Sequence, residues 1–393
     1  MAAPPVLPDE LVEEILLRLP PDDPAFLLRA SLVCKTWSRA VSHPSFRRRL
    51  PELHGTAPVL GFLHDWSDKR IPNFVPTTAS AFSLAAPDRR IWRALDCRHG
   101  RAFFVTEPKI CETRGLLVWE PVTGAQQRVP VPAAFGNMDE HILMYPSAAV
   151  FCAAAGCDHH GCHGGPFGVA FVFTVDPHND DHEEYVTSGC VYSSETGTWG
   201  ELTPMHCEFG MDFGDFTCVL VGRSLVVYFM SNSMAILEYN FQRNELALID
   251  TPDTPDYREI FSLMLAEDGG LGVIQDLDSH LKLWSREASD NTDGQWVLSR
   301  VIDLGNLLPV KALVNATSSL FVLGFAEGAD VIFVDTVVGL FTIELLSQRV
   351  RKVCGKNGFR QLIPVVDFFT PVSWNEHQDH LLWNASEEEG GEE

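Results

Sequence analysis

The stretch CAAAGCDHHGCHGG, residues 152–165, contains the residue types from which a metal site could be built. Five potential ligands fall within seven residues: Cys157, His159, His160, Cys162 and His163. Zinc binds thiolates and imidazoles tetrahedrally. Structural zinc sites, however, usually pair two ligands from one turn with two from a distant segment, and no second Cys-x-x-Cys follows here. We therefore predict a loop inserted between strands and no metal. If a metal did bind, its candidate ligands would be Cys157, His160, Cys162 and His163.

Two further stretches resemble catalytic groups. DPHNDDHEEY, residues 176–185, mixes His178 and His182 with acidic residues, which could perform acid–base work or bind a hard cation. A solvated turn is the simpler interpretation, because such charge runs usually face water. The kinase-like triplet at 212–214 has no glycine-rich loop, strand lysine or catalytic loop to accompany it. Since the sequence also lacks Gly-x-Ser-x-Gly, P-loop and Gly-x-Gly-x-x-Gly motifs, we predict no catalytic residue and no cofactor.

The charge of the chain is unevenly distributed. The 393 residues carry a formal net charge of −24, yet residues 1–50 hold seven basic and six acidic residues. An acidic body repels phosphate backbones, so we expect no nucleic-acid partner. No apolar run is long enough to span a membrane, and the first residues do not resemble a signal peptide. We interpret the ten irregularly spaced cysteines as reduced thiols and expect a location in the cytoplasm, the nucleus or both.

The first fifty residues predict three short helices. In LPDELVEEILLRLP, residues 7–20, apolar side chains recur every three or four residues, and Pro20 with Pro21 ends the helix. Asp22 or Asp23 can cap a second helix, and residues 32–41 form a third that stops at Pro44. Such a small unit buries its own core poorly. Its apolar surface therefore either covers the rest of this chain or contacts another protein.

The same segment resembles an F-box. The resemblance rests on Leu-Pro at 7–8 and 19–20, the leucine pair at 27–28, Val-Cys-x-x-Trp at 33–37 and Pro-x-Phe at 44–46. It implies docking on the SKP-type adaptor of a cullin-RING ubiquitin ligase. The implied contact residues are Leu7, Pro8, Leu11, Ile15, Leu16, Leu19, Pro20, Leu27, Leu28, Val33, Cys34 and Trp37. Some of these twelve must form the internal core of the helical unit, and the sequence does not divide them.

After the helical unit the sequence repeats a strand hairpin. Stretches beginning near residues 116, 190, 235, 281 and 331 share an apolar strand, a polar turn and a second strand. When Trp119, Tyr192, Tyr239, Trp284 and Asp335 are taken as equivalent, the steps between them are 73, 47, 45 and 51 residues. Three of these steps match the length of a four-stranded propeller blade. We predict a β-propeller rather than a pair of β-sandwiches, with six blades in preference to five or seven.

Two other segments complete the predicted ring. Residues 79–105 would supply an additional blade, and 58–66 could pair with 361–371 to close the ring without raw sheet edges. LLVWEPVTG, VYSSETGTW and the run from LKLW to DGQWVLSRVIDL resemble the F-box-associated propellers of plant F-box families. The Cys/His/Gly loop at 152–165 is similar to loops of the grass-type families.

We therefore predict a mainly β protein with a small N-terminal α domain. The predicted parts are a three-helix F-box at 1–50, a linker at 51–57, a single propeller at 58–378 and an acidic disordered tail at 379–393. The resemblance implies a non-catalytic substrate receptor that binds an SKP-type adaptor, through it a cullin scaffold, and an unidentified target protein, with no membrane contact. The target surface is expected on blade loops that include 152–165 and 176–184. The alternative is a propeller glycan-binding module or enzyme whose helical unit is only a structural cap.

Overall fold

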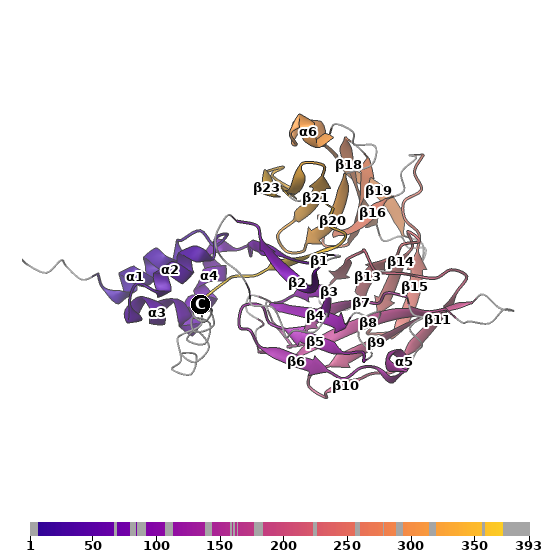
Figure 1. Cartoon of the computed structure of the whole chain (residues 1–393), viewed down its shortest axis with the longest axis horizontal. Helices are drawn as coiled ribbons and strands as arrows, with labels where there is room; N and C mark the ends of the chain where they lie inside the picture. The colour runs from indigo at the N-terminus through magenta and orange to yellow at the C-terminus, as the bar shows by residue number, and fades with distance from the viewer. Residues whose placement is uncertain are drawn as a thin grey trace, which may run out of the picture. The chain divides into compact units, whose positions relative to one another are not determined.

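The structure is a computed structural model of the chain (Figure 1), and it divides into two compact units. It describes residues 7–66, 69–78, 84, 92–106, 113–137, 144–157, 159, 162, 164–176, 184–222, 226–255, 260–277, 279–287, 294–313, 320–355 and 358–371, with no account of the side chains of 65–73. The first unit comprises the chain up to Gly55 with the segment that begins at Phe368, and the second comprises most of Thr56–Asp367. None of the helices in the described part has the length and apolarity to cross a bilayer.

Four helices form the first unit: α1 (Asp9–Leu17), α2 (Ala25–Ser31), α3 (Lys35–Ser42) and α4 (Pro44–His54). The Asp23 carboxylate accepts a hydrogen bond from the Ala25 backbone N–H at 3.0 Å, but the capping position of α2 is Pro24, one residue after the predicted aspartate. The predicted stop at Pro44 is also the first residue of α4, a helix that the sequence analysis missed. Proline suits this position because its absent N–H would have no helical partner there. The helix continues to His54, through part of the predicted linker.

The core of the helical unit is small and apolar. Its fully buried side chains include Leu16 and Leu17 of α1, Val41 of α3, and Phe46 and Leu50 of α4. Polar contacts add to this packing: Arg49 of α4 pairs with Glu13 at 2.8 Å and with Glu14, and His54 Nε2 lies 2.8 Å from the Leu17 carbonyl oxygen. The missed helix α4 therefore supplies much of the core that three helices would lack.

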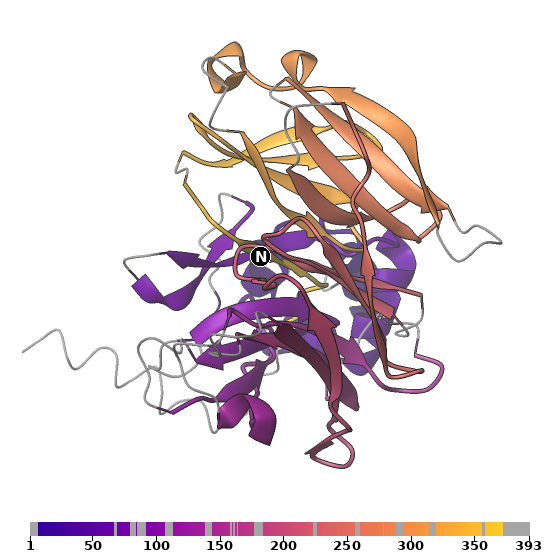
Figure 2. The ribbon, with the colours of Figure 1, turned by 90° about the vertical axis from the view of Figure 1, so that its right-hand side faces the viewer.

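Six antiparallel sheets form the second unit, which confirms the predicted propeller and its blade number (Figures 1 and 2). Each blade is given from its inner strand outward. One blade consists of β24 (Leu362–Val366), β1 (Val59–Trp66) and β2 (Lys69–Pro76), and the next of β3 (Trp92–Arg98), β4 (Arg101–Thr106), β5 (Leu116–Trp119) and β6 (Gln126–Val129). A third consists of β7 (Ser147–Cys152), β8 (Phe167–Val175) and β9 (Tyr185–Ser193), and both β10 (Thr198–Trp199) and β11 (Thr203–Cys207) pair with β9.

The fourth blade consists of β12 (Cys218–Val221), β13 (Val226–Met230), β14 (Ile236–Asn240) and β15 (Glu245–Ile249). The fifth consists of β16 (Phe261–Leu265), β17 (Leu271–Leu277), β18 (His280–Glu287) and β19 (Gln295–Asp303). The last consists of β20 (Phe321–Ala326), β21 (Val331–Thr336), β22 (Gly339–Glu344) and β23 (Val350–Cys354). Short helices α5 (Ala133–Gly136), η1 (Leu304–Asn306) and α6 (Val310–Leu313) lie in the connections. Contacts run from β3 to β7, β12, β16, β20 and β24 in turn and back to β3, so the inner strands form a closed ring.

The hairpin repeat is confirmed in four blades and wrong in phase in the fifth. Trp119, Tyr192, Tyr239 and Trp284 lie on the third strands of their blades. Asp335 instead lies on β21, a second strand, where it pairs with Leu340. The tight turn after β21 mimics the longer turn that follows a third strand elsewhere. Residues 92–105 do not form a blade of their own, because β3 and β4 pair with β5 and β6.

The blade of β24, β1 and β2 joins the two ends of the propeller sequence, as predicted. Strand β1 pairs antiparallel with β24, with Leu63 opposite Ile363. The buried ring of Phe62 packs edge-on against Phe333 and Phe359, with centroids 5.5 and 5.6 Å away. Closing the ring in this way leaves no unpaired inner strand, and it makes the propeller depend on a strand from each end.

Two tryptophans tie neighbouring blades together at their outer strands. Trp199 Nε1 on β10 donates to the Pro130 carbonyl oxygen at 2.6 Å, just after β6. Trp296 Nε1 on β19 donates to the Asp250 carbonyl oxygen at 2.8 Å, just after β15. In both cases the acceptor follows the outer strand of the preceding blade, so the same contact recurs at two blade boundaries.

Candidate functional site

The structure divides the twelve residues implied for adaptor binding into a surface and a core. Eight are exposed, and we call them the F-box surface: Leu7, Pro8, Leu11, Ile15, Pro20, Leu28, Val33 and Cys34. Leu19 and Trp37 are half-buried, whereas Leu16 and Leu27 are buried at 2% and 4% exposure. Leu16 and Leu27 therefore serve the internal core of the helical unit.

Helix α1 shows how this division arises. Leu11 and Ile15, one helical turn apart, are 52% and 51% exposed, while Val12 and Leu16 beside them point into the core. Apolar residues thus lie on two sides of one short helix, and only one side is covered by the described residues. Phe26, Leu32 and Leu53 are further exposed apolar residues of the helical unit that the resemblance did not include. The first two adjoin residues of the F-box motif, which is the signal that could have found them.

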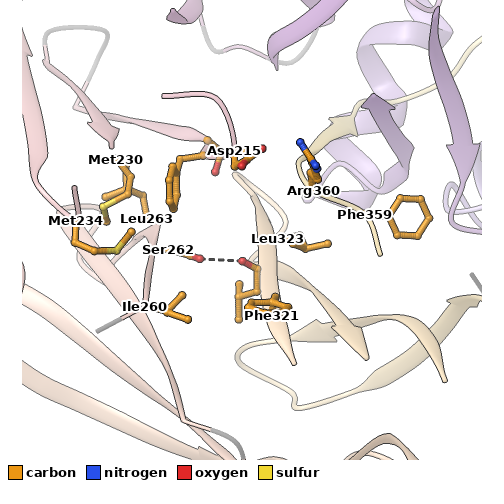
Figure 3. Close-up of a pocket in the computed structure, with 13 residues that line it drawn as sticks. Asp215, Met230, Met234, Ile260, Ser262, Leu263, Phe321, Leu323, Phe359 and Arg360 are labelled. Carbon is orange, nitrogen blue, oxygen red and sulfur yellow. Dashed lines mark hydrogen bonds between the residues drawn. The ribbon is translucent and has the colours of Figure 1, made fainter. Parts of the chain in front are cut away.

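The propeller contains a cavity of about 390 Å³ (Figure 3). Residues 215–217, 230, 234, 260, 262–263, 321–323 and 359–360 line it. Figure 3 shows the thioether side chains of Met230 and Met234 on one side and Phe359 with Arg360 on the other. Ser262 Oγ donates to the Val322 carbonyl oxygen at 2.9 Å and ties two inner strands together beside the cavity. The sequence does not reveal this cavity, because its lining residues belong to ordinary alternating strands and to unrelated turns.

Near the inner strands lies a buried ionic cluster. The Arg98 guanidinium lies 2.9 Å from a Glu327 carboxylate oxygen and 3.5 Å from one of Asp96, and Nη2 donates to the Cys218 carbonyl oxygen at 2.5 Å. Asp96 also accepts the Val150 backbone N–H at 2.8 Å. Burial raises the pKa of Asp96 to about 6, although Arg98 and the backbone donors oppose the shift. The cluster joins four blades, those of β3, β7, β12 and β20.

Part of the Cys/His loop does come together. The ligand atoms of Cys152, Cys157, His159 and Cys162 all lie within 4.8 Å of one another. Two of the sequence candidates, His160 and His163, lie outside the described residues. Cys152, the last residue of β7, was not a candidate, because nothing in the sequence shows that its side chain turns toward the loop.

The other suspected catalytic stretches give ordinary structure where they are described. Asp212 Oδ1 accepts the Gly214 N–H at 2.7 Å in a local turn, and Phe213 is fully buried in the core. Of residues 176–185, positions 177–183 lie outside the described residues. Glu184 forms an exposed ion pair with His206 at 3.5 Å. His178 and His182, the histidines of the suspected acid–base group, are among the positions outside the described residues.

Comparison with known proteins identifies both units. Residues 5–49 match the F-box domain, and residues 94–372 match the family described as F-box protein AT5G49610-like, beta-propeller. No curated protein matches the chain. Among solved structures, a functionally unknown protein from Desulfotomaculum acetoxidans DSM 771 aligns with 10% identity and a TM-score of 0.41, over 78% of this chain and 99% of that one. The second match spans most of the chain, which therefore belongs to the family of F-box proteins with an AT5G49610-like propeller.

Proposed function

We propose that the F-box surface docks on an SKP-type adaptor and that the propeller holds a target protein for ubiquitin transfer. The combination of an F-box with a propeller supports a substrate-adaptor role in SCF ligases in general. The observation that carries the docking proposal is the exposure of eight of the twelve implied contact residues. Exposed leucine and isoleucine side chains on a short helix suit a helix-in-groove interface.

In this proposal the chain performs no covalent chemistry. It raises the effective concentration of a target lysine near the conjugating enzyme that the scaffold carries. The target surface includes the blade loops at 152–165 and 176–184. The propeller cavity adds an apolar recess for a target side chain, with Asp215 and Arg360 in its lining to pair with charges of either sign.

We further propose that the protein works in the cytoplasm, the nucleus or both. None of the nine cysteines that the structure describes takes part in a disulfide, which agrees with a reducing compartment.

The docking proposal is tested by co-expression of the full chain with an SKP-type adaptor, followed by purification through the adaptor. We expect the wild-type chain to co-purify and Leu11→Asp to fail, because an unpaired charge would enter an apolar contact. Leu53→Asp is the matched control, since Leu53 is 51% exposed on α4 of the same unit but lies outside the F-box surface. Circular dichroism checks that each variant is folded.

Three outcomes would contradict docking. If the wild-type chain does not co-purify, the helical unit is only a cap. If folded Leu11→Asp still binds, the contact lies elsewhere. If Leu53→Asp fails equally, any charge on the helical unit disrupts the complex and the F-box surface has no special role.

A further inference from the structure

We propose that Cys152, Cys157, His159 and Cys162 together bind one zinc ion in a structural site at the β7–β8 connection. The site has the Cys₃His composition of closed tetrahedral zinc sites, in which no position is left open for a substrate. It requires no adaptor and no target, so its failure and the failure of the docking proposal are distinguishable.

The distances between the ligand atoms fit zinc. Bonds of about 2.3 Å to sulfur and 2.0–2.1 Å to nitrogen, at tetrahedral angles, place two sulfurs about 3.8 Å apart and a sulfur about 3.6 Å from a nitrogen. The observed separation is 3.5 Å between the Sγ atoms of Cys157 and Cys162. It is 3.6 Å between Cys162 Sγ and His159 Nδ1. Because no ligand pair exceeds 4.8 Å, binding would require shifts of about 1 Å at most.

The chain folds back to bring these ligands together. Strand β7 delivers Cys152, and the Ala153 N–H donates to the Pro166 carbonyl oxygen at 3.0 Å, which closes the base of the loop. The backbone of His159 has a positive φ of 63°, a strained conformation for a residue with a side chain. The His159 N–H points at Cys157 Sγ, 3.4 Å away, as a donor to a thiolate would. The end of β7 thereby supplies Cys152 as a ligand from outside the turn that carries Cys157, His159 and Cys162.

A second layer of contacts holds the loop. The buried Arg101 donates from Nη2 to the carbonyl oxygens of Cys162 and Gly165, at 2.6 and 2.8 Å. Its Nε lies 3.3 Å from Glu120, whose carboxylate also accepts the Gly164 N–H at 3.1 Å. Arg101 and Glu120 thus form a pair of opposite charges that holds the backbone of the loop on both sides of Gly164. Such outer contacts orient ligands in zinc sites.

The ring of His99 supports the same ligand set from the other side. It stacks on the His159 ring with centroids 4.4 Å apart, and its Nδ1 accepts the Cys152 backbone N–H at 3.0 Å. One imidazole therefore contacts two of the four proposed ligands. His99 thereby positions the backbone of Cys152 and the ring plane of His159.

A disulfide is the main competing explanation of the close sulfurs. A bond between Cys157 and Cys162 would bring their sulfurs to about 2.05 Å, and it would not explain why the Cys152 and His159 side chains converge on the same point. Three thiolates with one imidazole around one point favour zinc over magnesium or calcium, which prefer oxygen ligands. The four-ligand convergence is the observation that separates the two explanations.

The test uses the full chain, expressed with zinc in the medium and purified without chelators, and measures bound metals by mass spectrometry. We expect about one zinc ion per wild-type chain and almost none for Cys162→Ser. Cys207→Ser is the matched control, because Cys207 is equally buried but outside the ligand cluster, and it should keep its zinc. The exposed His159→Ala is a second variant that preserves the strand core and should bind zinc more weakly than wild type.

Two further measurements make the test decisive. A chelator should lower the melting temperature of wild type and of Cys207→Ser, but not that of zinc-free Cys162→Ser. Co²⁺ added to the chelated wild type should give the visible and near-ultraviolet bands of tetrahedral thiolate coordination. A folded wild-type chain without zinc and without Co²⁺ bands would overturn the proposal. So would cysteines in the cluster that resist alkylation until a reductant is added, or zinc retained by both Cys162→Ser and His159→Ala.

Discussion

Replacement of Arg98 by methionine should destabilise the propeller in a pH-dependent way. Methionine keeps much of the aliphatic length of the side chain but removes the cation that faces Asp96 and Glu327. The Arg98 side chain is only 8% exposed and the Asp96 side chain 9%, so water compensates poorly for the lost charge. Removing one partner of a buried ion pair costs about 3–5 kcal/mol, and we expect a loss of that size at pH 8.

The pH dependence follows from Asp96. Its pKa in the folded protein is raised from 3.8 to about 6, so folding favours the protonated form. The associated stability is fully present below about pH 4 and is lost as the pH rises through 6, a change of about 3 kcal/mol. Without Arg98, which lowers this pKa, the folded-state pKa of Asp96 moves higher still. At pH 5 the carboxyl is then protonated in the folded variant, and the loss should be smaller by about 1–2 kcal/mol.

The assay is urea unfolding at pH 5 and pH 8, followed by tryptophan fluorescence, because six of the nine tryptophans, from Trp66 to Trp296, belong to the propeller unit. Arg349→Met is the control, since its side chain is 64% exposed and pairs with Glu344 at 3.8 Å. An exposed pair of this kind contributes less than about 1 kcal/mol. The reasoning is refuted if Arg98→Met costs under about 1 kcal/mol at pH 8, or if its loss is the same at both pH values.

Five other substitutions, in three predictions, probe the two units. Leu11→Ala should weaken adaptor binding about five-fold without lowering the melting temperature, because it removes half-exposed apolar surface. Val12→Ala should instead cost about 2 kcal/mol of stability and leave the affinity for the adaptor unchanged. Calorimetry measures the affinity and thermal melts the stability, and equal effects of both variants on binding would contradict the division of α1 into an exposed and a buried side. Phe62→Ala should cost about 3–5 kcal/mol in thermal unfolding of the propeller, and Phe62→Leu clearly less; equal losses would show that ring packing in the closing blade is unimportant. Gly339→Ala should cost about 2 kcal/mol or more, since φ is +125° and the new methyl meets the carbonyl of the facing strand; an unchanged melting temperature would disprove this strain.

The local pattern of apolar and turn residues predicted most helices and strands of this fold. The remaining features depend on which strands and helices pack together in space. The helix at residues 9–17 and the third strands of four blades follow from apolar periodicity and turn residues, which act over a few positions. Asp335 was placed one strand out of phase because a tight turn and a longer turn give similar letter patterns. Pro44 was interpreted only as a stop, although proline ends one helix and begins the next equally well.

The candidate sites were less accessible to the sequence than the fold. Leu11 and Leu16 have the same side chain on the same helix, and only the position of α3 and α4 decides which is exposed. Cys152 could not be grouped with Cys157 and Cys162, because its direction depends on the pairing of β7 with β8. The cavity arises where turns and inner strands distant in sequence meet, and no local signal reports such a meeting.

The pairing of β1 with β24 has a consequence for synthesis on the ribosome. About 300 residues separate the two strands, so roughly 15–60 seconds of translation pass between their emergence. During that interval the edge of β1 that later receives β24 is exposed in the nascent polypeptide and open to aberrant association. A message truncated before codon 362 would yield a product that keeps the F-box helices but never completes its ring. Under the proposed function, such a product would occupy the adaptor without presenting a target and would inhibit the intact chain.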